Sequence, residues 1–313
     1  MPGLPRGIDS MTEATMRRFR GVIPPVLTPF TQDKALDEAA LAAVVDWFCH
    51  RPVGGLFMMG GLGEWRCLDW PERERIMRIA VEVVDGRLPI VPHIGGCNDL
   101  ENITKLGKVA CELDVLGVAL IIPEDIPEGP EPIYQHISAV ARAIEKPLAL
   151  YDPIGSGPRS VTPDLMGRML DDGIDFVAMK YRSMRGDDML DMVQIAGDRV
   201  EVLAGAETVF LPTLAVGGVG VIGGGCNVYP GVIAKLQQDF EAGRHTDAIE
   251  GQREVNRLLA TSSQVSWPLA GKAIWQAWGL PVQPVVRTAC DRCSPEAIRE
   301  VQDFFGPMQD IAG

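Results

Sequence analysis

Lys180 and Tyr151 are the two residues of this sequence that could act together on a carbonyl compound. Each follows a short apolar run, "DFVAM" before Lys180 and "PLAL" before Tyr151. A lysine removed from water loses its proton more easily, and the neutral amine can attack a carbonyl carbon to form a Schiff base. Such a reaction also transfers protons, which a phenol can donate and accept. Position alone leaves both roles open, because a strand-end lysine can extend its ammonium into water and a tyrosine can be a hydrogen-bonded core residue.

The other residues that commonly carry chemistry form weaker patterns. The four histidines include no pair at helix-face spacing, and Cys290 and Cys293 in "CDRC" lack the further ligands that a zinc site needs. The segment "GVGVIG" (218–223) matches G-x-G-x-x-G, but it lies inside an expected strand and does not open a helix. We therefore expect no metal, no bound cofactor and reduced thiols.

The composition indicates a globular protein that binds small molecules. The 313 residues are 46% hydrophobic and 23% charged, and the formal net charge is -13. This charge disfavours nucleic acid and anionic membranes as partners, because both attract clustered Lys and Arg. The start of the sequence has no apolar signal-peptide core, and no run of about eighteen apolar residues follows. We expect a cytoplasmic protein with a small-molecule substrate and with no nucleic-acid or membrane partner.

Eight apolar runs of strand length alternate with amphipathic runs of helix length. The expected strands are 21–30, 54–60, 88–96, 117–123, 147–153, 175–181, 200–206 and 218–224. The expected helices that follow them are 36–51, 70–86, 99–114, 130–145, 162–172, 187–196, 207–216 and 230–243. Apolar strands without strict alternation are typical of a parallel sheet covered by helices. Eight strand-then-helix units predict an α/β fold, a (β/α)8 TIM barrel.

Three further helix-like stretches follow the barrel, at 246–261, 267–279 and 294–306. We expect them to form a C-terminal helical extension packed on the barrel, since no linker precedes them. The predicted division is an N-terminal tail (1–20), the barrel (21–244) and the extension (245–313). Large aromatic side chains bury much area, so the tryptophans of the extension are interpreted as packing anchors more than as ligand contacts. They are Trp267, Trp275 and Trp278.

A barrel enzyme carries its active residues where the strands end, at one face of the barrel. In this sequence the polar or flexible groups at those ends are few. They are "GGLGEW" (60–65), His93, "PED" (123–125), Tyr151 with Asp152, Lys180, Glu207 and "GGGCN" (223–227). The fifth and sixth strands are neighbours, so the barrel should bring Tyr151 next to Lys180. His93 is open to two interpretations, a residue that faces the pocket or a structural, hydrogen-bonded histidine.

Six stretches along the chain, taken in order, resemble the dihydrodipicolinate synthase/N-acetylneuraminate lyase family of class I aldolases. They are "GVIPPVLTPF" (21–30), "GGLGEW" (60–65), "YD" (151–152), "FVAMK" (176–180), "GVGVIGGGCN" (218–227) and "KAIWQAWGLP" (272–281). The resemblance implies a barrel whose sixth-strand lysine forms a Schiff base with a 2-oxo acid. It implies this role for Lys180 and the proton-transfer role for Tyr151.

The resemblance also implies how the substrate is held. In the family, the turn after the second strand binds the substrate carboxylate, largely through backbone N–H groups. Gly61 and Leu62 occupy that position, although they replace paired hydroxyl residues and leave only the amides. Ile222 matches the position on the eighth strand whose backbone faces the substrate. Glu64 is interpreted as a brace for the turn.

Two departures separate the sequence from the lysine-biosynthesis synthase of this family. The synthase's tyrosine after the fourth strand is absent from "PEDIPEG" (123–129). Its arginine that binds the second substrate is absent after the fifth strand, unless Arg159 takes that role. Trp65 and the acidic segment 123–125 would then shape the far end of the pocket for an uncharged or hydroxylated tail.

We therefore expect a lyase that forms a Schiff base with pyruvate or another 2-oxo acid. The reaction would be aldol cleavage or condensation, or the dehydration or deamination of a 2-oxo sugar acid or related compound. The alternative is a catalytically altered barrel that binds a small carboxylic acid as a sensor or scaffold. The resemblance also implies a homo-oligomer, either a tetramer or a dimer.

Overall fold

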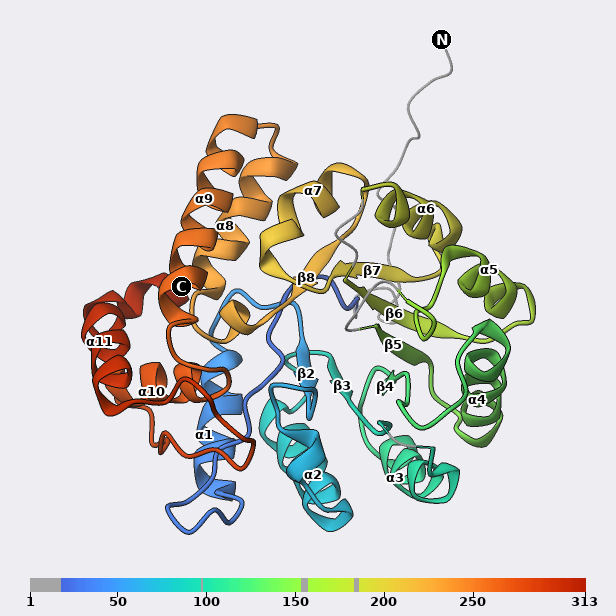
Figure 1. Cartoon of the computed structure of the whole chain (residues 1–313), viewed down its shortest axis with the longest axis horizontal. Helices are drawn as coiled ribbons and strands as arrows, with labels where there is room; N and C mark the ends of the chain where they lie inside the picture. Colours follow the sequence, from blue (N-terminus) through green and yellow to red (C-terminus); the bar gives the residue numbers. More distant parts are fainter. Residues whose placement is uncertain (1–17, 97, 153–156, 183–185) are drawn as a thin grey trace.

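The computed structural model describes residues 18–96, 98–152, 157–182 and 186–313, so most of the predicted tail and Cys97 lie outside the described residues. Strands alternate with helices in the predicted order (Figure 1). The strands are β1 (Gly21–Ile23), β2 (Leu56–Met58), β3 (Ile90–Pro92), β4 (Val118–Ile121), β5 (Leu148–Asp152), β6 (Phe176–Tyr181), β7 (Glu201–Ala204) and β8 (Gly220–Ile222). Each lies inside the range predicted for it.

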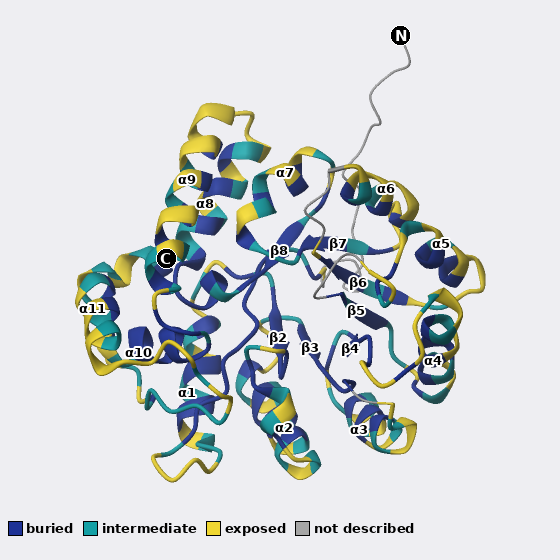
Figure 2. Ribbon diagram, in the orientation of Figure 1, coloured by how far each residue is buried: buried dark blue, intermediate teal, exposed yellow. Residues whose placement is uncertain are grey.

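Helices of the barrel follow the strands, and each begins and ends within three residues of its predicted range. They are α1 (Glu38–Phe48), α2 (Trp70–Val84), α3 (Leu100–Glu112), α4 (Pro130–Ala143), α5 (Pro163–Asp171), α6 (Gly186–Ala196), α7 (Phe210–Ala215) and α8 (Pro230–Glu241). Thr162 caps α5 by accepting a hydrogen bond from the Leu165 N–H, and Pro163 occupies the first turn. In Figure 2 the helices bury the faces that lie against the strands and expose the opposite faces.

The strands close into a ring. One parallel sheet has the order β1-β8-β7-β6-β5-β4, and β2 pairs in parallel with β3. Single parallel bridges join the two sheets, from Pro25 to Phe57 and from His93 to Ala119. The ring therefore runs from β1 through β8 and back to β1, and the predicted (β/α)8 barrel is confirmed.

One side chain from each strand points into the barrel, and together they form an apolar layer across its centre. They are Ile23, Phe57, Val91, Ala119, Ala149, Ala178, Leu203 and Ile222. Phe19, which the predicted division assigns to the tail, is fully buried in the same cluster. Side chains alternate along a strand with a period of two. The next inward residues after Ala149 and Ala178 are therefore Tyr151 and Lys180.

Three helices follow the barrel: α9 (His245–Ser262), α10 (Leu269–Ala277) and α11 (Pro295–Phe305). α9 packs along α8, and α10 packs on α11 (Figure 1). The Trp275 N–H donates to the Asn227 carbonyl at 2.8 Å, and the Trp278 N–H donates to the Phe305 carbonyl at 2.8 Å. These two tryptophans are the expected packing anchors. The division of the chain at residues 20 and 244 stays a prediction.

None of the helices in the described ranges combines the length and the apolar character that crossing a bilayer requires.

Candidate active site

Lys180 and Tyr151 lie side by side at the carboxyl ends of β6 and β5. They are partners in the parallel ladder, and the Lys180 Nζ stands 4.1 Å from the centre of the Tyr151 ring. Lys180 is only 8% exposed. The amine therefore lies against the phenol ring and is largely shielded from water. The contact agrees with the predicted strand order, in which the fifth and sixth strands are neighbours.

The turn after β2 lies against the phenol. A Cβ atom built on Gly61 would lie 3.5 Å from the Tyr151 hydroxyl, so the turn and the hydroxyl are in van der Waals contact range. The Gly61 and Leu62 N–H groups have no hydrogen-bond partner among the described residues. The Leu62 Cδ1 lies 3.3 Å from a Cβ position on Gly224, so the turn reaches from Tyr151 to the segment after β8.

The structure thus brings together four of the five residues predicted for the site. Lys180, Tyr151, Gly61 and Leu62 surround one region at the mouth of the barrel. Ile222 lies one layer deeper, where its buried side chain belongs to the apolar layer at the barrel centre. Only its backbone is left to approach a ligand. The roles of all five remain to be tested.

Glu64 fixes the turn from its buried side. Its backbone is left-handed, with φ of 58°, and the residue is only 2% exposed. The carboxylate accepts hydrogen bonds from the Lys272 Nζ at 2.7 Å, from the Arg287 N–H at 2.7 Å and from the Thr288 N–H at 2.8 Å. Burial lowers the pKa of Lys272 to about 8, although the Glu64 charge opposes this shift. Glu64 is a brace, as the sequence predicts.

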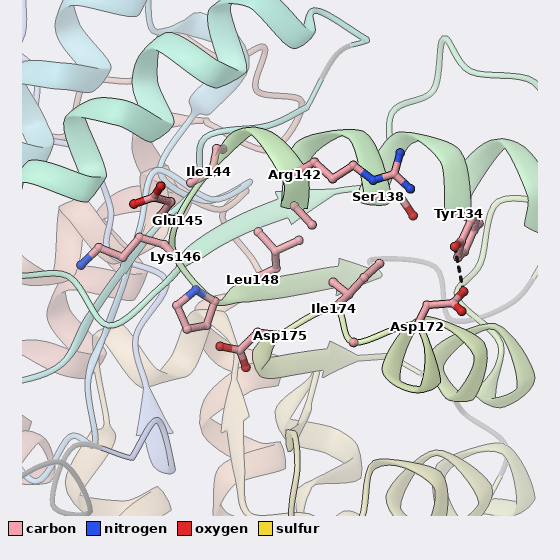
Figure 3. Close-up of a pocket in the computed structure, with 13 residues that line it drawn as sticks. Tyr134, Ser138, Arg142, Ile144, Glu145, Lys146, Leu148, Asp172, Ile174 and Asp175 are labelled. Carbon is pink, nitrogen blue, oxygen red and sulfur yellow. Dashed lines mark hydrogen bonds between the residues drawn. The ribbon is translucent and has the colours of Figure 1, made fainter.

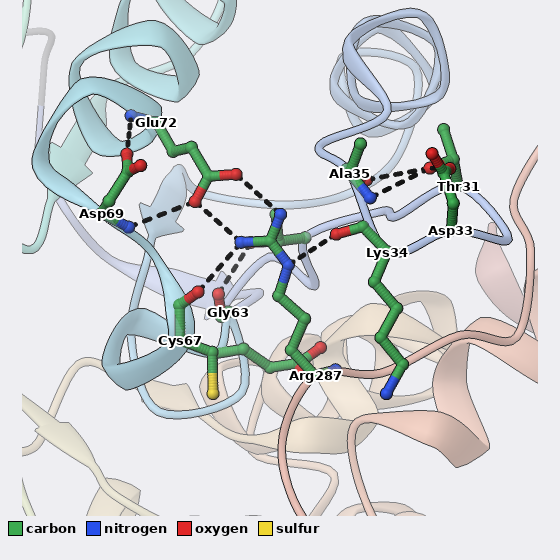
Figure 4. Close-up of polar contacts among 11 residues, drawn as sticks. Thr31, Asp33, Lys34, Ala35, Gly63, Cys67, Asp69, Glu72 and Arg287 are labelled. Atoms are coloured by element: carbon green, nitrogen blue, oxygen red, sulfur yellow. Dashed lines mark hydrogen bonds and ion pairs between the residues drawn. The ribbon is translucent and has the colours of Figure 1, made fainter.

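Arg287 extends this network to the loops that follow β1 and β2 (Figure 4). Its guanidinium donates to both carboxylate oxygens of Glu72, at 2.7 and 2.6 Å. It also donates to the carbonyls of Cys67 at 2.9 Å and Lys34 at 2.8 Å. A bidentate arginine fixes geometry as well as charge. The segment before α11 therefore clamps the loops that follow β1 and β2.

Glu207, at the end of β7, is a site residue to which sequence reasoning gave no role. Its carboxylate accepts the Gly225 N–H and occupies the place where a Cβ of Gly223 would stand. Burial raises its pKa above the ordinary 4.5, while hydrogen bonds from backbone N–H groups and the charges of Lys180 and Arg182 oppose the rise. The sequence does contain a sign of this position: Glu207 is the acidic residue that follows the seventh expected strand, at the face where a barrel enzyme carries its active residues.

His93 is buried and hydrogen-bonded. It is fully buried, and its Nε2 lies 3.3 Å from the Ile121 N–H, which donates to it. The Arg73 guanidinium donates to the His93 carbonyl at 2.9 Å. Burial, followed by the nearby Arg73 charge, holds the pKa of His93 well below 6.5, so the ring is neutral. This arrangement favours the second of the two interpretations left open by the sequence.

Arg159 is engaged with the loop after β4. Its Nη1 donates to the Glu128 carboxylate at 3.0 Å, and its Nε donates to the Ile126 carbonyl at 3.3 Å. The Gly129 N–H also donates to the Pro158 carbonyl at 2.8 Å, so three hydrogen bonds join the loops after β4 and β5. In this arrangement Arg159 holds the two loops together.

The acidic segment 123–125 also bonds to its neighbours. Glu124 forms an exposed ion pair with Arg66 at 2.7 Å, and Asp125 accepts the Asn98 N–H at 3.0 Å. Trp65 packs edge-on against the His93 ring, 5.3 Å between centroids. These contacts make the loops after β2, β3 and β4 a connected rim around the mouth.

Tyr181, directly after the lysine, faces away from the barrel interior because side chains alternate along β6. It is 2% exposed and belongs to the main core between strands and helices. Burial, with smaller contributions from Asp188 and Asp152, raises the pKa of Tyr181 to about 12. The residue is therefore a packing side chain of the outer layer, which accounts for an aromatic residue at this position.

A cleft of about 380 Å³ opens at the opposite face of the barrel. Lys146 and Pro147 precede β5 there, and Asp175 precedes β6, while Tyr134 and Asp172 form a hydrogen bond at its other end (Figure 3). None of the predicted site residues lines it. The chemistry predicted from the strand ends belongs to the other face.

Comparison with protein families assigns the chain to one of them. The model of the "Dihydrodipicolinate synthetase family" matches residues 18–305, which span the barrel and almost all of the extension. The chain belongs to the dihydrodipicolinate synthetase family. The resemblance stated from the six motifs is thereby confirmed.

Known relatives of this family member agree with the assignment. The 4-hydroxy-tetrahydrodipicolinate synthase of Brucella abortus is 30% identical over 234 residues, which are 75% of this chain and 80% of the relative. The crystal structure of YagE, a prophage protein of E. coli K12 in complex with pyruvate, has a TM-score of 0.83 at 25% identity and covers 94% of this chain and 98% of its own. The N-acetylneuraminate lyase of Mycoplasma synoviae shares the fold, with a TM-score of 0.82 at 21% identity over 92% of this chain and 97% of its own.

Homologues in this family are lyases of the class I aldolase type, and the prediction of an enzyme of this class is confirmed. Members act through Schiff bases on pyruvate-type substrates, and they are typically oligomeric. The dihydrodipicolinate synthetase family member described here retains a lysine at the end of β6 and a tyrosine at the end of β5.

Glu64→Gln is expected to destabilise the fold by about 3–5 kcal/mol, because it leaves the buried Lys272 ammonium without its counter-charge. Urea unfolding would measure the change. Glu38→Gln is the matched control, since Glu38 forms an exposed ion pair with Arg75 and its loss should leave the stability almost unchanged. Equal, small losses for both variants would contradict the bracing role.

Glu207→Gln is expected to gain stability relative to the wild type as the pH rises above 4.5. A carboxyl group whose pKa is raised by folding stabilises the fold at low pH, and this contribution is lost as the pH rises through the raised value. Glutamine cannot ionise, so the variant escapes the loss. Urea unfolding at several pH values tests this, with the exposed Glu82→Gln as control. A difference from wild type that stays constant with pH would contradict it.

Proposed function

We propose that this protein is a Schiff-base lyase in which the Lys180 amine attacks the keto carbon of a 2-oxo acid. The observation that carries the proposal is the Lys180 Nζ 4.1 Å from the centre of the Tyr151 ring, with the Gly61 turn against the phenol hydroxyl. An amine, a proton carrier and backbone N–H donors thus surround one region. Membership of a lyase family supports the same conclusion.

The chemistry follows from these groups. The neutral Lys180 nitrogen forms a bond to the keto carbon, and the keto oxygen takes up the proton that the nitrogen releases. The resulting hydroxyl accepts a second proton and leaves as water, which gives a protonated imine. Tyr151 is the proposed carrier of these protons. The imine then draws electrons from the substrate, so that a carbon–carbon bond breaks to release an aldehyde or a hydroxyl leaves as water.

The substrate carboxylate is proposed to bind the N–H groups of Gly61 and Leu62, which have no partner among the described residues. Backbone N–H groups are strong donors to an anion, so the loss of the family's side-chain hydroxyls leaves the binding mode intact. The backbone of Ile222 is proposed to face the substrate from β8. The bound pyruvate of YagE supports a 2-oxo acid as the ligand class. A homo-oligomer, either a dimer or a tetramer, belongs to the same proposal.

Lys180→Ala is expected to abolish a borohydride-trapped adduct with pyruvate, because no amine then reaches the keto carbon. Mass measurement of the intact protein after reduction detects the adduct. Lys235→Ala, at a lysine whose side chain is 71% exposed on α8, should retain it. An adduct that survives Lys180→Ala would overturn the mechanism. An adduct without turnover on a panel of 2-oxo sugar acids would instead indicate a binding barrel.

Tyr151→Phe is expected to lower turnover by about a hundredfold or more, because proton transfer loses its carrier. The adduct should still form, more slowly, since Lys180 is unchanged. Turnover is measured with the 2-oxo sugar acid that the wild type converts fastest. Tyr134→Phe is the matched control, since its hydroxyl bonds to Asp172 at the opposite face of the barrel and its loss should leave turnover unchanged. Equal turnover in Tyr151→Phe and the wild type would exclude the proposed role.

A further inference from the structure

Cys290 and Cys293 are the most closely spaced cysteines of the sequence, and the proposed function gives them no role. The chain bends at Asp291 and Arg292, between the two. The Cys290 Sγ donates to the Arg292 carbonyl at 3.6 Å, and the Cys293 Sγ donates to the Cys290 carbonyl at 3.4 Å. Both sulfur atoms therefore belong to one compact bend of the chain.

The Cys293 thiol acts directly on its neighbour. The pKa of Cys290 lies above its ordinary value, first because the residue is partly buried and also because of a hydrogen bond with the Cys293 thiol and its charge. A hydrogen bond with Ser266 opposes the rise. Two side chains in a hydrogen bond are already neighbours in space. A disulfide between them needs little movement of the backbone.

The bend is fixed by Ser266, which precedes α10. The Ser266 N–H donates to the Arg292 carbonyl at 2.8 Å, and its hydroxyl accepts the Arg292 N–H at 3.1 Å. The same hydroxyl donates to the Asp291 carboxylate. Ser294 then caps α11 directly after the bend. Because this segment is already ordered, a covalent link across it costs little further conformational entropy.

The pair also differs from the other described cysteines in its surroundings. Cys293 is exposed and Cys290 is half-buried, so an oxidant in solution can reach the first and the second is beside it. Redox-sensing cysteines are typically accessible to solvent and placed next to a second cysteine that can react with them. In the described part of the chain, no hydrogen bond joins the remaining cysteines to another cysteine: Cys49, Cys67, Cys111 and Cys226.

The bend belongs to the segment that braces the candidate active site. Thr288 comes two residues before Cys290, and it donates its N–H and its hydroxyl to the Glu64 carboxylate at 2.8 and 3.0 Å. Its hydroxyl also lies 3.8 Å from the Cys67 Sγ. The two thiols are thus joined through a short stretch of chain to the donors that hold Glu64.

We propose that Cys290 and Cys293 are a redox pair that forms a reversible disulfide with a low-molecular-weight disulfide as the oxidant. With oxidised glutathione, the Cys293 thiolate attacks one sulfur, forms a mixed disulfide and releases one glutathione thiolate. The Cys290 sulfur then attacks the Cys293 sulfur and releases the second glutathione. The two protons of the protein thiols pass to the released glutathiones, so the protein is oxidised and the glutathione is reduced.

The pair is independent of the proposed function, because its reaction needs no substrate. It is also compatible with the expected reduced thiols, since disulfides that form in a reducing compartment are typically transient and redox-sensing.

The test incubates the whole chain with oxidised glutathione, blocks the remaining thiols by alkylation and measures the intact mass. The wild type is expected to lose two hydrogens and to protect two thiols from alkylation, and peptide mapping should find the link between residues 290 and 293. Reduced glutathione in excess should restore both thiols. Cys290→Ser should instead retain one glutathione on Cys293, because the mixed disulfide has no neighbouring thiol to resolve it.

Cys67→Ser is the matched control, since Cys67 lies near the same segment, and this variant should form the disulfide as the wild type does. A wild type whose two thiols stay free in oxidised glutathione overturns the redox pair. A link from either cysteine to a different cysteine does the same. The wild-type peptide map decides the matter even where a variant fails to fold. The proposed function fails separately, through a wild-type protein that forms no borohydride-trapped adduct with any 2-oxo acid.

Discussion

A carboxylate removed from water must be surrounded by donors, and at Glu64 this requirement joins three distant parts of the chain. The residue ends the turn that follows β2, yet its partners Lys272, Arg287 and Thr288 all belong to the segment after the barrel. An ion pair with both side chains fully buried tolerates little displacement, because either charge left alone would be strongly unfavourable. The conformation of the turn is thus set by the extension. The placement of Gly61 against the Tyr151 hydroxyl depends on it, and so does the proposed site.

The second constraint is the alternation of side chains along parallel strands. Inward positions at Ala149 and Ala178 are small, and the next inward positions are Tyr151 and Lys180. The two large groups therefore stand above two small side chains of the apolar layer, at the end of the strands where loops can reach them. The same alternation sends Tyr181 outward into the helix layer. One register of β6 determines both the chemistry of the lysine and the packing of its neighbour.

Local patterns were enough to predict most of the fold. Apolar runs bounded by turns gave every strand, and the strand order placed Tyr151 beside Lys180 because neighbouring strands of a barrel end at the same face. The contacts of Glu64 could not be predicted from local patterns. The Arg287 N–H that binds its carboxylate lies 223 residues away along the chain, and no motif near either residue indicates the contact.

The charged groups around the mouth are largely committed to one another, and this bears on how a ligand is held. Arg159 pairs with Glu128, Arg66 pairs with Glu124, and Arg287 clamps Glu72. These pairs stabilise the rim and leave none of the three guanidiniums as a dedicated partner for an acid. An acid bound as proposed would meet the amide N–H groups of the turn and the Tyr151 phenol, beside the Lys180 amine. Neutral donors select by geometry more than by net charge, because each must point at its own acceptor. Under the proposed function, such a site would distinguish 2-oxo acids by where their oxygens lie.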